Sequence, residues 1–296
     1  MNQPELGVII VSWNVRDLLR TCLMSLLRET PANTPILVID SASTDGTVAM
    51  LRNEFPMVDV TACADNIGYV RGNNLGLNRL GFAVPSVQAG SSTPPRFVWL
   101  LNPDTEVLPG AVTTLLDFMH THPRCGLCGP KLINPDGSLQ HGAFEFPGLR
   151  QLLLETQPFL WRFRGTRLDG RYPPALYDAG RPFPIGHPLG AAMLARAEAI
   201  AQVGPLDPGY EMYSEEVDWA MRMKQAGWER WCVPAAVVKH YGGASSSQAN
   251  ARAEQIKWRS RQRYYQKHYS PLKRRLALWL MPARFRNSNR TTDREE

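Results

Sequence analysis

The stretch Phe97-Val98-Trp99-Leu100-Leu101-Asn102-Pro103-Asp104-Thr105-Glu106 decides the fold. Its first five residues are apolar and predict a buried strand. The strand must end at Asn102-Pro103-Asp104, because proline cannot donate a hydrogen bond to a neighbouring strand. An amide oxygen and a carboxylate therefore follow directly at the carboxyl end of the strand. In open α/β sheets, this is the edge where ligands bind.

Two interpretations of this corner are open. It can be a simple turn, in which an Asn or Asp side chain bonds to the backbone that follows. It can also be a ligand site, because a hard divalent cation that carries a diphosphate takes one or two carboxylate or carbonyl oxygens from the protein. The neighbouring segments of the chain favour the second interpretation.

Two further apolar runs end in polar residues. Residues 6–11 lead into Ser12-Trp13-Asn14, and residues 35–39 lead into Asp40-Ser41. Apolar side chains at helical spacing follow each run, and Asp45 is placed to cap the second helix. Strands and helices that alternate in units of about 30 residues predict a parallel sheet. Three polar strand ends would then meet at one edge and form a nucleotide site.

Taken together, several motifs resemble the family-2 inverting glycosyltransferases of the GT-A fold. Within that family, the chain is most similar to bacterial rhamnosyltransferase-like members that build cell-surface polysaccharide. The resemblance covers residues 6–245. Its motifs are Val11-Ser12-Trp13-Asn14, Asp40-Ser41-Ala42-Ser43-Thr44-Asp45-Gly46-Thr47, Asn66-Ile67-Gly68-Tyr69-Val70-Arg71-Gly72-Asn73-Asn74, Leu101-Asn102-Pro103-Asp104-Thr105, Gly129-Pro130-Lys131, Pro135-Asp136-Gly137, Tyr213-Ser214-Glu215-Glu216-Val217-Asp218-Trp219 and His240.

This resemblance implies an α/β protein with a GT-A fold, in which a Rossmann-like nucleotide-binding mixed sheet is flanked by helices. We expect a glycosyltransferase domain over residues 1–248, with a nucleotide-sugar half at 1–120 and an acceptor half at 121–248. A basic, amphipathic helical extension would follow at 249–296. The implied reaction is inverting transfer of a sugar, rhamnose or another hexose, from a dTDP- or UDP-sugar donor to a glycan or polyprenyl-linked glycan acceptor.

Such a transfer needs a cation on the leaving diphosphate and a base for the acceptor hydroxyl. Asp104 is the candidate metal ligand, while the family's first aspartate is replaced here by Asn102. The loss of one negative charge predicts a modest metal affinity of the site, and Asn102 is expected to contact ribose or diphosphate instead. His240, after a strand predicted at 231–239, is the second candidate ligand for Mg²⁺ or Mn²⁺. Taken alone, it would pass for an ordinary core or surface histidine.

The base is expected within Glu215-Glu216-Val217-Asp218. Crowded carboxylates cannot all ionise cheaply, so one of them should have a raised pKa. The resemblance assigns the base to the second member of an acidic pair, which is Glu216, with Asp218 as the alternative. The competing interpretation is a set of acids that complements the dipole at a helix start.

Nucleotide contacts are expected from the strand ends and from the loop near Gly68. Asp40 is placed to accept from a pyrimidine N–H or a ribose hydroxyl, and Trp13 to stack on the base. Arg71 would supply a cation beside the permissive Gly68 loop, where phosphate can approach closely. The predicted nucleotide-sugar set is Ser12, Trp13, Asn14, Asp40, Ser41, Asn66, Gly68, Arg71, Asn74, Asn102 and Asp104.

Two other functions stay open. A sugar-nucleotide pyrophosphorylase shares a similar nucleotide fold, but its glycine-rich basic loop is replaced by Ser12-Trp13-Asn14. A non-catalytic nucleotide-sugar binder on a membrane would not need Asp104, Glu216 and His240 together. A nicotinamide enzyme is disfavoured because no G-x-G-x-x-G follows the first apolar run.

The charge distribution separates the tail from the body. Residues 251–296 carry a net charge of +9, whereas residues 1–250 carry −3. The tail interleaves basic residues with aromatics and leucines, as does the segment 159–164, which predicts peripheral contact with an anionic membrane. The alternative is a helix packed on the body with a solvated basic face; nucleic acid ranks well below both. With no transmembrane stretch or signal peptide and with five reduced cysteines, we expect a cytoplasmic protein on the inner face of the cell membrane.

Overall fold

A computed structural model describes residues 3–84, 93–242, 250–282 and 285. The last part of the predicted extension, 286–296, lies outside these residues. None of the described helices is long and apolar enough to cross a membrane. All five cysteines carry free thiols, and four of them are buried, as expected for core residues.

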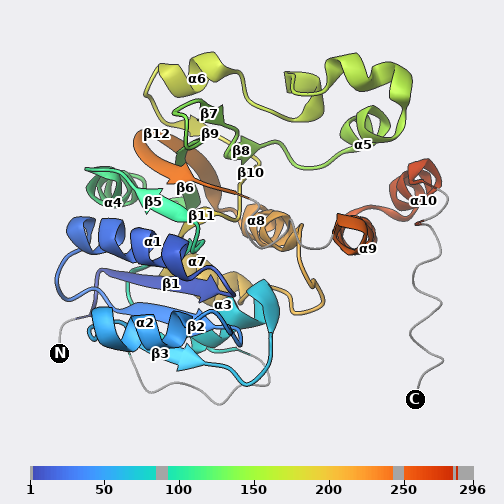
Figure 1. The fold of residues 1–296 in the computed structure, drawn as a ribbon. Helices are drawn as coiled ribbons and strands as arrows, with labels where there is room; N and C mark the ends of the chain where they lie inside the picture. Colours follow the sequence, from blue (N-terminus) through green and yellow to red (C-terminus); the bar gives the residue numbers. More distant parts are fainter. Residues whose placement is uncertain (1–2, 85–92, 243–249, 283–284, 286–296) are drawn as a thin grey trace.

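A mixed sheet forms the centre of the molecule, with strand order β3-β2-β1-β4-β11-β6-β12-β5 (Figure 1). The strands β1 (Leu6–Ser12), β2 (Ile36–Asp40), β3 (Asp59–Ala62) and β4 (Phe97–Leu101) run parallel, as the alternating pattern predicts. Strand β11 (Ala192–Arg196) runs antiparallel to both β4 and β6 (Cys125–Ile133), and this makes the sheet mixed. Beyond β6, β12 (Glu229–His240) pairs parallel with β6 and antiparallel with β5 (Thr105–Val107).

Helices cover both faces of this sheet. On one face, α1 (Arg16–Glu29), α2 (Thr47–Glu54) and α4 (Ala111–Thr121) pack in one apolar cluster with Val8 and Ile10. On the other, α3 (Gly68–Arg79), α7 (Ala197–Val203) and α8 (Glu215–Gln225) pack with Ile9. Successive residues of a strand point to opposite faces, so a strand buried on both sides must be apolar throughout. This explains why the strands appear in the sequence as continuous apolar runs.

The register brings the predicted strand ends together. Ser12 pairs with Asp40, and Ile10 pairs with Leu101, so the polar residues after β1, β2 and β4 share one edge of the sheet. The N-cap residue of α2 is Gly46, and Asp45 supports the helix start from one residue earlier, because its Oδ1 accepts from the backbone N–H of Thr47 at 3.1 Å. The remaining elements are β7 (Leu139–Gln140), β8 (Ala143–Phe144), α5 (Leu149–Thr156), η1 (Pro158–Phe163), η2 (Arg167–Asp169), α6 (Pro174–Asp178), β9 (Phe183–Pro184) and β10 (His187–Pro188).

The C-terminal helix α9 (Asn250–His268) packs on the body rather than standing free. Its Trp258, Tyr264 and Tyr265 form an apolar cluster with Leu152 of α5 and Val217 of α8. The helix α10 (Pro271–Leu280) follows and joins the same cluster through Ala277. The sequence left two interpretations of the tail open, contact with a membrane and packing on the body. For α9, the structure shows packing on the body.

Candidate active site

A pocket of about 380 Å³, which we call the inner pocket, opens at the sheet edge predicted to bind ligand. Residues from β1, the start of α3, the 102–104 corner, the loop before β11 and the start of α8 line it together with His240. A larger outer cavity, of about 840 Å³, adjoins it, and α9 forms one of its walls. The two share Trp13, Asn66, Gly68, Tyr69 and Met212, so they form a continuous cleft.

Asp104 and His240 lie together on the wall of this pocket. His240 Nε2 is 3.3 Å from Asp104 Oδ1, and His240 Nδ1 is 2.7 Å from Gln140 Oε1. With Nδ1–H donating to Gln140, the lone pair of Nε2 faces the carboxylate. Two electron-rich atoms at this distance need a proton or a cation between them. The pair therefore has the chemistry of two ligands for one divalent ion.

The protein would supply only part of a coordination shell here. Among the described residues, no group of three or more His, Cys, Asp or Glu side chains is placed to hold a metal. A site with two protein ligands suits a cation that also binds diphosphate oxygens. The corner itself is held by Thr105, whose hydroxyl donates to the Asn102 carbonyl at 2.7 Å. The corner Asn102-Pro103-Asp104 is therefore a hydrogen-bonded turn, and its Asp104 carboxylate still faces His240. Its interpretation as a turn and its interpretation as a ligand site are both compatible with the structure.

Two glutamates at the start of α8 face the pocket. Glu215 is buried and Glu216 is partly exposed, and one carboxylate oxygen of each has no hydrogen-bond partner among the described residues. Burial raises the pKa of Glu216, and burial together with the Glu216 charge raises the pKa of Glu215. The preceding Tyr213 and Ser214 both have φ of 66°, a strained conformation for side-chain-bearing residues. Both glutamates line the pocket, and Glu216 is the more exposed residue of the pair.

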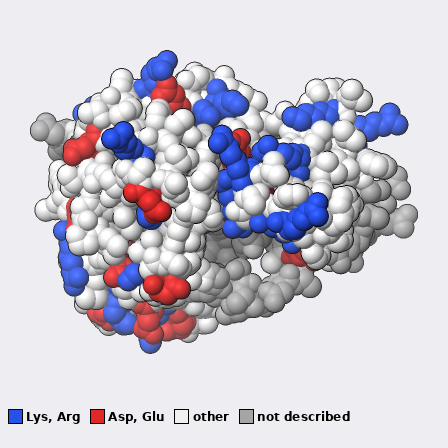
Figure 2. Space-filling model, turned by 90° about the horizontal axis from the view of Figure 1, so that it is seen from above, with Lys and Arg blue, Asp and Glu red and all other residues white. Residues whose placement is uncertain are grey.

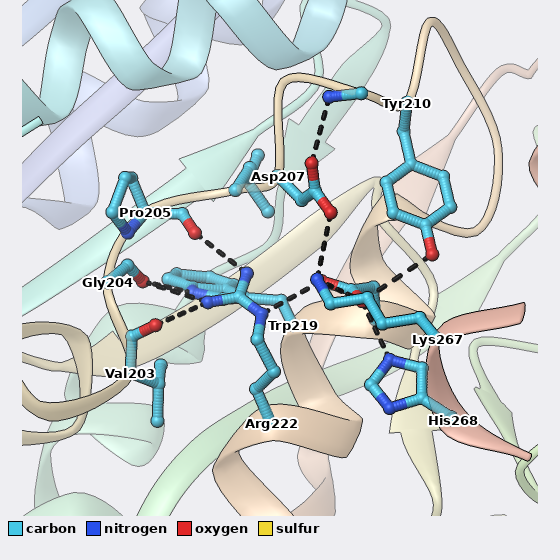
Figure 3. A network of polar contacts seen from close by, with 12 residues as sticks. Val203, Gly204, Pro205, Asp207, Tyr210, Trp219, Arg222, Lys267 and His268 are labelled. Carbon is cyan, nitrogen blue, oxygen red and sulfur yellow. Dashed lines mark hydrogen bonds and ion pairs between the residues drawn. The ribbon is translucent and has the colours of Figure 1, made fainter. Parts of the chain in front are cut away.

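Asp218, the alternative base, occupies a different place. It is fully buried, and Arg222 Nε, Lys267 Nζ and His268 Nε2 lie 2.8, 2.8 and 2.7 Å from its oxygens (Figure 3). Burial alone would raise the pKa of Asp218, but the hydrogen bonds from His268 and Lys267 hold it well below its usual range. An anion paired in this way cannot take a proton from a substrate. The structure corrects this part of the prediction: Asp218 anchors α8 to α9.

A protein-family model matches more than half of the chain. Residues 7–181 match the model of glycosyl transferase family 2. The chain is a member of this family. This makes it a glycosyltransferase, and neither the pyrophosphorylase nor the non-catalytic scaffold is supported.

Two curated relatives of this family 2 glycosyltransferase come from Mycobacterium tuberculosis, strains CDC 1551 / Oshkosh and H37Rv. Each is an N-acetylglucosaminyl-diphospho-decaprenol L-rhamnosyltransferase, 31% identical over 249 residues, which are 81% of this chain and 77% of the relative. Similar solved structures are GalNAc-T7 with UDP, GalNAc and Mn²⁺ (TM-score 0.57, 15% identity) and the mannosyltransferase PcManGT from Pyrobaculum calidifontis with GDP-Man and Mn²⁺ (TM-score 0.56, 17% identity). They cover 94% and 95% of this chain, which spans 55% and 73% of theirs, and they confirm the GT-A fold.

Most predicted nucleotide-sugar residues of the glycosyltransferase line the cleft. They are Ser12, Trp13, Ser41, Asn66, Gly68, Asn102 and Asp104 in the inner pocket and Arg71 in the outer cavity. Asp40 lies behind them, with Oδ2 accepting from Ser43 N–H at 2.9 Å, while its buried Oδ1 has no partner among the described residues.

Two predicted residues have a structural role instead. The Asn14 side chain accepts from Thr44 N–H at 2.7 Å and braces the loop after β2. The Asn74 amide clamps Leu206, donating to its carbonyl at 2.8 Å and accepting from its N–H at 3.0 Å. Neither Asn14 nor Asn74 is among the residues that line the two cavities, so the structure does not bring them together with the rest of the predicted set.

Sequence reasoning missed several residues of the site. Gln140 orients His240, and Tyr69 donates its hydroxyl hydrogen to the Gly190 carbonyl at 2.8 Å across the pocket. Tyr69 sits inside a recognised motif and could have been singled out as a wall of the pocket. Gln140 and Gly190 stand in segments with no local signal, because only the tertiary fold brings them to the sheet edge.

Proposed function

We propose that this glycosyltransferase moves a hexose, with L-rhamnose the first candidate, from a dTDP- or UDP-sugar to a polyprenyl-diphosphate-linked glycan in cell-surface polysaccharide synthesis. One observation carries the proposal: the Asp104–His240 pair and Glu216 line the same pocket. The names of the mycobacterial relatives support both the sugar and the lipid-linked acceptor. The enzyme would then work as a peripheral protein at the inner face of the cell membrane.

Asp104 and His240 are proposed to hold Mg²⁺ or Mn²⁺. When bound there, a divalent cation neutralises the charge that develops on the leaving diphosphate. Gln140 orients the imidazole of His240, and the two backbone segments are joined where Tyr241 N–H donates to the Asp104 backbone carbonyl at 2.9 Å, so both ligands are held in place before substrate arrives. Such preorganisation avoids rearrangement of the ligands during the reaction.

Glu216 is proposed as the general base. Its carboxylate takes the proton of the acceptor hydroxyl while that oxygen bonds to the anomeric carbon and the bond from this carbon to the diphosphate breaks. Attack from the face opposite the leaving group inverts the anomeric configuration. The raised pKa of Glu216 suits this role, because a base with a pKa nearer neutrality accepts a proton more effectively in the transition state.

The donor nucleotide is proposed to occupy the part of the cleft nearest β1 and β2. Trp13 can stack on the pyrimidine, and the unpartnered Oδ1 of Asp40 can accept from its N–H or from a ribose hydroxyl. Arg71, on the wall of the outer cavity, can neutralise phosphate charge. These placements agree with the open edge of the sheet where the strand ends meet.

A donor panel tests this function. dTDP-rhamnose, UDP-hexoses and a GDP-sugar are each incubated with a short polyprenyl-diphosphate-linked N-acetylhexosamine, and release of nucleoside diphosphate is measured with Mg²⁺, Mn²⁺ or excess chelator. We expect release that depends on acceptor and cation and that is highest for a pyrimidine donor. Release of inorganic pyrophosphate from a sugar phosphate and a nucleoside triphosphate, or donor binding without turnover under every condition, would refute the proposal.

A further inference from the structure

Exposed apolar side chains concentrate in two segments of the glycosyltransferase. Of the nine exposed large hydrophobic residues in the described structure, six lie either within 158–169 or on α10. They include Phe159 at 71%, Leu272 at 81% and Trp279 at 65% exposure. Soluble proteins seldom gather such side chains without a binding partner, and interfacial tryptophans are typical of membrane contacts.

The two segments are neighbours in the fold. Helix α5 contacts both η1 and α10, so residues 158–169 and α10 flank the same helix. Figure 1 shows them at the upper right of the molecule, beyond the edge of the central sheet. We call residues 158–169 together with α10 the apolar-basic surface.

This surface is also cationic. Within 158–169 stand Arg162, Arg164 and Arg167 against Asp169, and α10 carries Lys273, Arg274 and Arg275 with no acidic residue in its sequence. The guanidinium groups of Arg162 and Arg164 lie over the rings of Phe163 and Trp161, at 4.8 and 4.3 Å from the ring centroids. Figure 2, which looks down on the upper face of Figure 1, shows Lys and Arg exceeding Asp and Glu over its right-hand part.

Several basic residues of α9 form ion pairs with the body of the protein. Lys257 pairs with Glu155, Arg263 pairs with Asp207, and Lys267 bridges Asp207 and Asp218. These cations hold the helix on the body, so they contribute little to the attraction of an external anionic surface. The membrane contact that the sequence places in the whole tail and at 159–164 is therefore narrowed to α10 within the tail and kept at residues 158–169.

We propose that the apolar-basic surface docks on an anionic lipid bilayer, with Phe159, Trp161, Leu272 and Trp279 in the interface and the flanking arginines at the headgroups. Aromatic and leucine side chains supply apolar area, while Lys and Arg near the surface add electrostatic attraction. This inference deepens the proposed function by naming the part of the enzyme that meets the lipid of its acceptor. The docking itself is inferred only from the exposed apolar and basic residues of this surface and does not depend on the proposed function.

Vesicle flotation of the full chain tests the docking. We expect flotation with vesicles that contain phosphatidylglycerol, weak flotation with pure phosphatidylcholine, and loss of binding as salt rises. The double variant Phe159→Ser/Leu272→Ser should lower the partition coefficient by about tenfold or more. Arg274→Gln/Arg275→Gln should lower it with anionic vesicles and reduce its salt dependence.

Two control variants change exposed residues outside the apolar-basic surface. Met57→Ser removes a side chain of 65% exposure on the connection between α2 and β3 and should leave flotation unchanged, as should Arg52→Gln on α2. Removing α9 is not a suitable test, because it would uncover the cluster around Val217. Equal flotation of the surface variants and wild type, an equal loss in the Met57 control, or equal binding to neutral vesicles would overturn the proposal.

A soluble acceptor separates this inference from the proposed function. Turnover with a short-chain acceptor in the absence of vesicles should be the same in wild type and in Phe159→Ser/Leu272→Ser. If wild type floats but transfers no sugar, the proposed function fails while the docking surface survives. If it transfers sugar but does not float, the docking surface is refuted on its own.

Discussion

Asp218→Asn should lower the free energy of unfolding by about 3 kcal/mol, because it removes a buried carboxylate on which Arg222, Lys267 and His268 converge. Breaking a buried pair by removing one partner costs about 3–5 kcal/mol. The lower end applies here, since the cations keep other acceptors: Arg222 also donates to the Val203 and Pro205 carbonyls, and Lys267 also pairs with Asp207 (Figure 3). His268, whose side chain is 3% exposed, is left facing a neutral amide.

Urea unfolding, followed by circular dichroism and tryptophan fluorescence, measures this loss. The control is Asp17→Asn, which removes a carboxylate that also pairs with arginine but is 70% exposed, and its loss should be much smaller because exposed ion pairs contribute little to stability. The effect also depends on pH. Because the folded pKa of Asp218 is depressed, its contribution is present above the unfolded pKa and is lost as pH falls, by about 1 kcal/mol at pH 3. Equal losses in the two variants, or a difference between Asp218→Asn and wild type that grows toward acid pH, would refute this account of α8 and α9.

Other expected outcomes concern the pocket. Asp104→Ala should remove most transferase activity and the response to added cation while circular dichroism stays native; full activity in that variant, or in excess chelator, would exclude the metal assignment. Glu215→Gln should raise the free energy of unfolding at pH 8 relative to wild type but have less effect at pH 5. The reason is that a buried acid with a raised pKa contributes stability that is lost as pH rises through its pKa in the folded state. Urea unfolding at both pH values measures this, and a less stable variant at pH 8 contradicts it. The product should have the anomeric configuration opposite to that of the donor, which NMR coupling constants read directly, and retention would rule out a single-base displacement.

The sequence predicts β1, β2 and β4 well because these strands are buried on both faces. Continuous apolar runs such as 97–101 must then end at polar residues, and parallel pairing places those ends at one edge. The strand predicted at 231–239 lies outside this pattern; it spans Glu229–His240, so His240 is its last residue. The Asp104–His240 pair arises from the antiparallel pairing of β12 with β5, in which His240 pairs with Thr105.

The assignment of Asp218 shows what the sequence cannot settle. Residues two apart on an α-helix point about 200° from each other, so Glu216 and Asp218 cannot face the same pocket. The Asp218–Arg222 pair at i, i+4 is visible in the sequence, but His268 and Lys267 come from a helix about 50 residues further on. Likewise, Asn74 meets Leu206 only in the folded chain. Long-range pairing of charges and amides, rather than local pattern, decides which polar residues are structural.

The catalytic role of Glu216 is the central claim, and one variant tests it most directly. In Glu216→Gln, the turnover rate and the donor dissociation constant are measured on the same preparation, with Glu215→Gln as the matched neighbour. Loss of a general base should lower turnover by about a hundredfold to ten-thousandfold, while donor affinity stays within a few-fold of wild type because the nucleotide contacts lie elsewhere in the cleft. Turnover in Glu216→Gln within about tenfold of wild type, below the range expected for the loss of a base, would contradict the account.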